Sequence, residues 1–217
     1  MLLLGLDTAT AAVTAAVADG ERAGDPVLAE STVLDARGHG ERLAPAIARV
    51  LAEAGIDRRD LGAVAVGVGP GPFTGLRVGL VTARVLGTVL NIPVFGVCTL
   101  DALSLAAGLD GPHLVATDAR RREIYAATYQ GRTRTSGPHV GPASTFATDL
   151  PAVGQGALLH PEAFPRAREP GHPGAGAVCR WVLADLPTLP PNPLYLRRPD
   201  AEVPGARKPA LPPAAGR

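Results

Sequence analysis

The sequence predicts a layered α/β fold in two lobes, of which the second is smaller. Short aliphatic segments alternate with segments of helical period over residues 1–107, and strands that alternate with helices form layered sheets. After Gly111 the chain begins again with two strand-like segments, HLVATDA and EIYAATYQ. A chain of 217 residues with 46% hydrophobic content is long enough for one large domain or two small lobes.

The first lobe is predicted for residues 1–110. It opens with three aliphatic or β-branched segments separated by Gly, Asp and Pro, which predict antiparallel strands: LLLGLD, AAVTAAVAD and PVLAESTVL. The period changes at His39, and the spacing of Leu43, Ile47 and Val50 predicts an amphipathic helix from His39 to Ala54. Further along, the pattern predicts strands at 63–68 and 94–97 and helices at 73–90 and 99–107.

The second lobe is predicted for residues 111–203. Its first two strands are joined by a charged turn, and residues 131–176 are so rich in Gly, Pro, Thr and Ser that they predict no definite element. A last helix is expected at about 177–186, around Trp181. Frequent prolines follow, and we expect residues 204–217 to be a disordered tail.

Charge and cysteine content narrow the classes of protein. The formal net charge is +1, which argues against a protein that grips nucleic acid by its own electrostatics. Cys98 and Cys179 lie in apolar segments, where reduced, buried thiols are expected. We find no convincing signal peptide or membrane span, and the expected location is the cytoplasm.

A glycine-rich segment, GVGPGPFTGLRVGL, joins a predicted strand to a predicted helix at Gly67 to Leu80. Such a turn can bind phosphate at a helix N-terminus. The segment lacks the Lys-Ser/Thr pair of a P-loop and the glycine spacing of a dinucleotide fingerprint, and its two prolines remove amide donors. We therefore favour a tight structural turn.

Small residues recur every fourth position along the helix that follows, at Gly75, Gly79, Ala83 and Gly87. The stripe lets another element approach closely. The packing that results must offset the cost of each glycine in a helix interior, about 1 kcal/mol relative to alanine. The neighbour is the helix from His39, a partner chain, or both, and spacing leaves an internal core helix and a subunit interface equally open. The candidate interface residues are His39, Arg42, Leu43, Ala46, Ile47, Val50, Gly75, Leu76, Gly79, Leu80, Ala83 and Gly87.

Three passages resemble the TsaB family, also called YeaZ: LLLGLDTAT, VGVGPGPFTGLRVGLVTARVLGTVLNIPVFGVCTLDAL and DARRREIY. PLYLRRPDAE near the C-terminus is a weaker match, and the middle of the second lobe departs from the family pattern. The resemblance implies the fold of actin, Hsp70 and sugar kinases (ASKHA), in which two related α/β lobes face a cleft.

The resemblance also implies a function. TsaB is the non-catalytic relative of TsaD, which transfers threonylcarbamoyl onto the tRNA adenosine 3′ of the anticodon. Where TsaD has a metal-binding His-x-x-x-His, the similar positions here hold Thr99 and Leu103, which are not ordinary transition-metal ligands. The expected protein has no catalytic residue, metal or cofactor.

The implied partners are TsaD as a heterodimer, the ATPase TsaE acting on that pair, and tRNA bound through the complex. A chain that leaves an apolar helix uncovered is also expected to form a homodimer when alone.

Two further groups have alternative interpretations. The first group could bind nucleotide or phosphate, or it could simply cap turns, and consists of Asp7, Thr8, Thr10 and Asp118. If these residues bind nucleotide, the alternative function follows, an ASKHA-type ATP-dependent phosphotransferase that uses the inter-lobe cleft. Arg120, Arg121 and Arg122 either face tRNA phosphates or form a solvated turn. Only 4% of residues are aromatic, which argues against base stacking as a main function.

Overall fold

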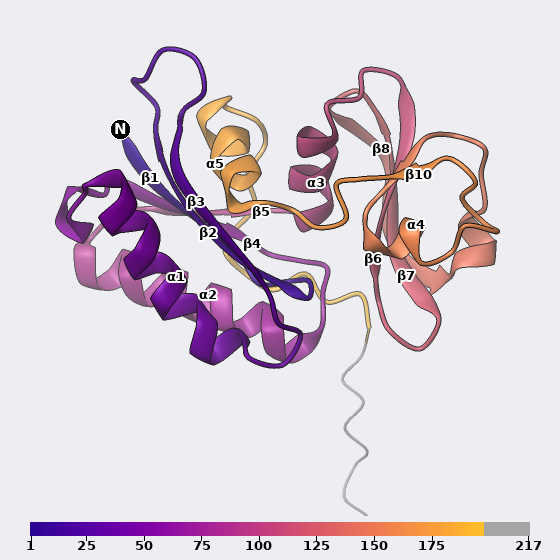
Figure 1. Ribbon diagram of the computed structural model, residues 1–217, viewed down its shortest axis with the longest axis horizontal. Helices are drawn as coiled ribbons and strands as arrows, with labels where there is room; N and C mark the ends of the chain where they lie inside the picture. Colours follow the sequence, from indigo (N-terminus) through magenta and orange to yellow (C-terminus); the bar gives the residue numbers. More distant parts are fainter. Residues whose placement is uncertain (198–217) are drawn as a thin grey trace, which may run out of the picture.

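The computed structural model describes residues 1–197 as two lobes, each built on one five-stranded sheet (Figure 1). In the first sheet the order is β3-β2-β1-β4-β5, with β1, β2 and β3 antiparallel and β4 and β5 parallel to β1. Its strands are β1 Leu2–Asp7, β2 Ala12–Asp19, β3 Val27–Leu34, β4 Ala63–Gly67 and β5 Val94–Val97. The predicted strands of the first lobe are confirmed.

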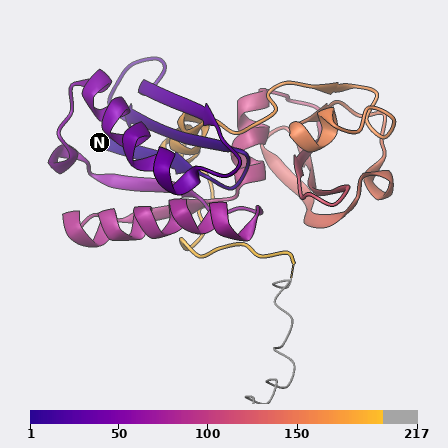
Figure 2. The same cartoon turned by 60° about the horizontal axis from the view of Figure 1, so that its bottom comes forward.

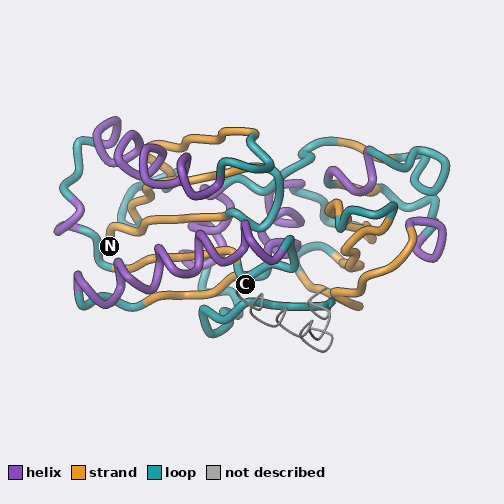
Figure 3. Tube along the Cα trace, turned by 90° about the horizontal axis from the view of Figure 1, so that it is seen from below, coloured by secondary structure: helices purple, strands orange, loops and turns teal. Residues whose placement is uncertain are grey.

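Helices cover both faces of the first sheet. On one face α1 (His39–Ala54) and α2 (Phe73–Leu90) run alongside each other (Figures 2 and 3). On the other face lies α5 (Ala175–Leu183), and α3 (Thr99–Ala107) leads toward the second lobe. The short 3₁₀ turn η1 (Arg58–Asp60) precedes β4. The predicted helices at 39–54, 73–90 and 99–107 are confirmed.

The side chains of β1 alternate between the two faces of the first sheet, as the period of a strand requires. In β1, Leu4 and Leu6 join the core beneath α1 and α2, whereas Leu3 joins the core beneath α5. Gly5 lies on the same side as Leu3, and a Cβ there would be 2.5 Å from the Ala175 carbonyl oxygen. Leu4 and Leu6 therefore pack beneath two helices, and the lack of a side chain at Gly5 allows α5 to approach the backbone closely.

The second sheet has the order β10-β9-β6-β7-β8. Strands β6 and β7 form an antiparallel hairpin that β8 extends, and β9 pairs parallel to β6. The bounds are β6 Pro112–Asp118, β7 Glu123–Gln130, β8 Thr133–Pro142, η2 Ala143–Phe146, β9 Ala152–Val153, α4 Gln155–Leu158 and β10 Ala167–Arg168.

Two features differ from the sequence-based expectations. Strand β8 lies in the segment for which no element was predicted, because a Gly-Pro pair at Gly137 interrupts its strand pattern. The last helix spans Ala175–Leu183 rather than 177–186 and packs on the first sheet, so the predicted extent of the second lobe, 111–203, is wrong for this helix. The predicted tail, 204–217, lies outside the described residues.

Helix α2 is, among residues 1–197, the one helix that is long and apolar enough to cross a membrane by length and composition. The core helix of a globular protein passes the same test. Six of its residues are buried against the lobe, including Leu76, Leu80 and Ala83.

Candidate functional site

The end of β1 is a buried polar turn that holds Asp7. One carboxylate oxygen accepts from the Ala9 amide (2.8 Å), and the other accepts from the Thr99 hydroxyl at the start of α3 (2.8 Å). Burial is the largest influence on this carboxyl and raises its pKa to about 6, although both hydrogen bonds oppose the shift. The contacts of Asp7 therefore cap the turn and join β1 to α3.

The two positions that resemble the TsaD metal ligands serve packing. The Thr99 hydroxyl also accepts from the Gly69 amide (3.2 Å), so it links the glycine-rich turn to Asp7. Leu103 is fully buried in the core that the second lobe shares with α3. Within residues 1–197, no group of three or more His, Cys, Asp or Glu side chains is placed to hold a metal ion.

Thr8 holds the N-terminal half of α2 against the first lobe. Its hydroxyl donates to the Gly75 carbonyl (2.8 Å) and accepts from the Gly79 amide (2.9 Å). A Cβ at Gly79 would lie 2.6 Å from this hydroxyl, and one at Gly75 would lie 3.1 Å from His39 Nε2. The small-residue stripe thus faces the chain's own β1 turn and α1.

Most of the predicted interface residues are interior residues of the first lobe. The buried ones are His39, Leu43, Ala46, Val50, Gly75, Leu76, Gly79, Leu80, Ala83 and Gly87. Arg42 is exposed and Ile47 is half-buried. The interface stays a prediction for the helix pair, but the buried residues cannot supply its contact surface because their own lobe already covers them.

A row of exposed apolar side chains occupies the opposite face of α2. Val81, Val85 and Val89 recur every fourth residue and are 57%, 54% and 73% exposed, and Phe73 lies on the same line at 38%. We call Val81, Val85 and Val89 the valine row. Sequence reasoning did not single it out, although its four-residue spacing was visible beside the small-residue stripe.

A small cavity of about 50 Å³ lies between the lobes. Of the predicted nucleotide or phosphate residues, Thr10 and Asp118 line it, whereas Asp7 and Thr8 do not. Ligand pockets typically measure roughly 300–1,000 Å³. This cavity is too small for a nucleotide, and the arrangement gives little support to the phosphotransferase alternative.

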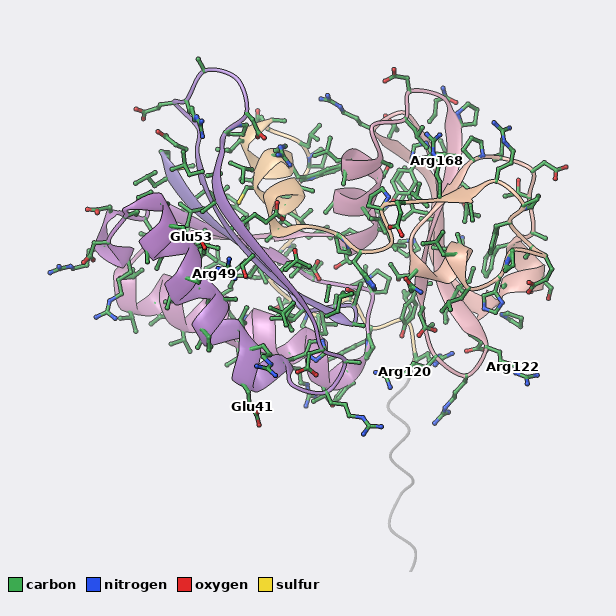
Figure 4. The ribbon with its side chains drawn as sticks, in the orientation of Figure 1. Glu41, Arg49, Glu53, Arg120, Arg122 and Arg168 are labelled. Carbon is green, nitrogen blue, oxygen red and sulfur yellow. The ribbon has the colours of Figure 1, made fainter. Side chains whose placement is uncertain are left out.

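The predicted tRNA-facing arginines form the turn between β6 and β7. Arg120, Arg121 and Arg122 all have left-handed backbone conformations, with φ of 61°, 55° and 62°. Such a conformation costs about 1–2 kcal/mol for each non-glycine residue. Arg120 and Arg122 leave the turn in opposite directions (Figure 4), and Arg120 lines the inter-lobe cavity. We call residues 119–123 the arginine turn.

Comparisons with known proteins place the chain in a family. The model of the family described as TsaD, tRNA N6-adenosine threonylcarbamoyltransferase, matches residues 28–158. An uncharacterized protein of Mycobacterium tuberculosis is 46% identical over 202 residues, which cover 92% of this chain and 93% of that protein.

Two further relatives carry the TsaB and YeaZ names. The tRNA threonylcarbamoyladenosine biosynthesis protein TsaB of Escherichia coli is 35% identical over 133 residues, 60% of this chain and 55% of that protein. The solved structure of YeaZ from Pseudomonas aeruginosa has a TM-score of 0.74 and 27% identity, and the match covers 90% of this chain and 99% of that one.

The two sheets and the match to YeaZ define a two-lobed α/β protein of the ASKHA type, as the sequence predicted. The positions that resemble the TsaD ligands carry a hydroxyl and a leucine side chain instead of imidazoles. The chain belongs to the TsaD family and, within it, to the TsaB group, also called YeaZ.

Proposed function

We propose that this chain is the non-catalytic cytoplasmic subunit that forms a heterodimer with TsaD. Together with the ATPase TsaE, the pair transfers threonylcarbamoyl to the tRNA adenosine 3′ of the anticodon. Membership in the TsaB group supports this role, because relatives from several bacteria are named tRNA threonylcarbamoyladenosine biosynthesis proteins.

The non-catalytic part of the proposal rests on residue chemistry. Thr99 has its hydroxyl engaged with Asp7 and with the Gly69 amide, and Leu103 offers no donor atom. Asp7 itself is fully buried and bonded within the turn. These contacts support a scaffold that keeps the family fold and uses its former site for packing.

The proposed contact surface of the heterodimer is the valine row. Three valines that are each more than half exposed, aligned on one helix, form an apolar strip of the kind found at the centre of subunit interfaces. The adjacent helix α1 carries exposed charged side chains, among them Glu41, Arg49 and Glu53 (Figure 4). Arg49 and Glu53 already pair with each other at 2.7 Å, so they need no partner charge.

TsaD is the proposed occupant because it belongs to the same family. The family match includes all of α1 and α2, so TsaD is expected to present the same helix pair. Two copies of one helix pair can then face each other about a two-fold axis, which would bury the valine row between them. The same geometry would permit a homodimer of the isolated chain.

The experiment is to replace Val85 by Asp and measure binding to TsaD by titration calorimetry and co-purification. A carboxylate buried at the centre of an apolar interface has no partner, so we expect affinity to fall at least about 100-fold. The thermal unfolding midpoint should stay close to that of the wild type, because Val85 is exposed in the isolated chain.

Leu159→Asp is the matched control, since Leu159 is 52% exposed but follows α4 in the second lobe rather than lying on α2. It should bind TsaD normally. Wild-type affinity in V85D would remove this interface from the proposal. Calorimetry of the isolated chain with ATP and Mg²⁺ tests the alternative, because tight binding with turnover would make the chain a phosphotransferase.

A further inference from the structure

The last described segment, residues 187–197, crosses from the first lobe to the second (Figures 1 and 2), and we call it the strap. The Gly96 amide donates to the Leu189 carbonyl and the Leu189 amide donates back to the Gly96 carbonyl, each at 2.8 Å. Further along, the Leu194 amide donates to the Val68 carbonyl at 2.8 Å. The strap therefore begins as an addition to the edge of the first sheet, at β5.

The strap also binds the side of α2. Arg84 Nε donates to the Pro191 carbonyl (2.9 Å), and Arg77 Nε donates to the Tyr195 hydroxyl (3.0 Å). The Tyr195 ring stacks on Phe73 with ring centroids 4.8 Å apart, and the Arg77 guanidinium lies 3.6 Å from the Phe73 ring centroid on α2. A perturbation of this part of α2 reaches the strap directly.

At its far end the strap holds the arginine turn. Arg197 Nη1 donates to the Ala119 carbonyl (2.8 Å), and the Arg197 guanidinium forms an ion pair with Glu123. These two partners are the first and last residues of the turn. Between them lie three consecutive left-handed residues, a conformation that L-residues adopt only where their surroundings hold it.

The turn also has hydrogen bonds between its own residues. The Ala119 amide donates to the Glu123 carbonyl (2.9 Å), the Glu123 amide donates to the Arg120 carbonyl (3.0 Å), and the Arg120 amide donates to the Asp118 carboxylate (2.7 Å). The Arg197 guanidinium closes the turn from outside by bonding both of its ends. Its removal would take this outer closure away from a strained, exposed turn.

We propose that Arg197 is a positioning residue for the arginine turn, and that the strap couples the order of this turn to the α2 surface. In this proposal the strap exchanges between the docked arrangement seen here and a released one, and the contacts at each of its ends favour the docked arrangement. Leu194 strengthens the coupling because it packs against the cores of both lobes. The coupling is a property of the isolated chain and does not depend on a TsaD complex.

Amide hydrogen exchange on the full chain tests the positioning role. In Arg197→Ala we expect exchange of the Ala119 and Glu123 amides to rise at least about tenfold, while amides of β2 keep their wild-type rates. Arg197→Lys retains the charge beside Glu123 but not the fork of donors, so it should give a smaller increase. Arg132→Ala, an exposed arginine of the same lobe, is the matched control and should change neither amide.

Wild-type exchange of the Glu123 amide in R197A would overturn the positioning role. If R197A also accelerates β2, the comparison moves to R197K, in which a selective increase at the turn supports the proposal and equal exchange at the turn and β2 refutes it.

The coupling has its own test at the α2 end of the strap. Tyr195→Ala removes the stacking on Phe73 and the bond from Arg77 without altering any group in contact with the turn. We expect exchange of the Glu123 amide to rise several-fold in this variant as well. A rise confined to amides of the strap and α2, with the arginine turn unchanged, would refute the coupling even if R197A behaves as expected.

Discussion

Asp7 is a carboxyl group buried in the first lobe, where both of its oxygens accept hydrogen bonds. In a nucleotide-binding site such a group would need access to solvent and to a cation. Here the donors are the Ala9 amide and the Thr99 hydroxyl, and the inter-lobe cavity does not reach it. At the residue scale, a side chain that suits phosphate chemistry has become a structural contact.

The pH dependence of stability should report this burial. The pKa of Asp7 rises from 3.8 in the unfolded chain to about 6 in the folded protein, so its proton stabilises the fold. That stabilisation is complete below about pH 3.8 and is lost as the pH rises through about 6, a difference on the order of 3 kcal/mol. Asp7→Asn is neutral at every pH and keeps one acceptor and one donor for the same partners.

We therefore expect the free energy of unfolding of D7N to rise relative to that of the wild type as the pH rises from about 4 to about 7. The expected gain is on the order of 3 kcal/mol, the free-energy equivalent of the pKa shift. Urea unfolding of both proteins at several pH values measures it. Other carboxyls contribute equally to the two proteins, so the difference isolates Asp7. A difference that is constant with pH would contradict the assignment.

Among the elements, helix α2 has two apolar faces that differ in residue size and in exposure. Its glycines let the helix approach the β1 turn closely enough for Thr8 to bond both the Gly75 carbonyl and the Gly79 amide. Its valines face away from the sheet and stay exposed. The inner face positions the helix, and the outer face is the surface proposed for the partner.

Gly79→Ala tests the seating of this helix. Alanine favours a helix interior, but a Cβ here would lie 2.6 Å from the Thr8 hydroxyl, so we expect a net loss of about 1–3 kcal/mol in the free energy of unfolding. Gly40→Ala in α1 is the control, because no atom lies within 4 Å of its added Cβ. Urea unfolding should show G40A unchanged or stabilised, and equal values for both variants would contradict the close contact.

The two lobes are joined by buried polar groups as well as by the strap. The Tyr129 hydroxyl of the second sheet donates to Asp101 on α3 (2.7 Å), and Arg134 Nη1 donates to Cys98 Sγ (3.3 Å). Burial raises the pKa of the Asp101 carboxyl and raises that of the Cys98 thiol to about 12. Cys98 therefore remains a protonated, inert thiol at the junction, as the sequence predicted for a buried cysteine.

Tyr129→Phe tests this junction. The substitution leaves Asp101 buried with Arg134 as its nearest charge at 3.6 Å, and we expect a loss of about 1–3 kcal/mol. Tyr195→Phe removes a hydroxyl from a residue that is 39% exposed and should cost less than about 0.5 kcal/mol. Chemical denaturation followed by circular dichroism compares them, and a Y129F curve that overlays the wild type would contradict a structural role for this bond.

Local patterns predicted most of the first lobe and little of the second. The helix bounds at His39–Ala54 and Phe73–Leu90 follow from clear periodicity and from the left-handed residues that end each helix, Gly55 and Asn91. Strand β8 was missed because Gly and Pro carry no strand signal. Its pairing with β7, which no local pattern encodes, makes it a strand.

The sequence by itself determined the family, the order of strands and helices in the first lobe, and the loss of the two histidines, because each is written in residue types at fixed spacings. Only the tertiary structure decided which face of α2 is covered, where α5 packs, and that the strap reaches the arginine turn. Those features depend on contacts between segments distant in the chain, such as Thr8 with Gly79 and Arg197 with Ala119, and side-chain periodicity within one element does not specify its neighbour.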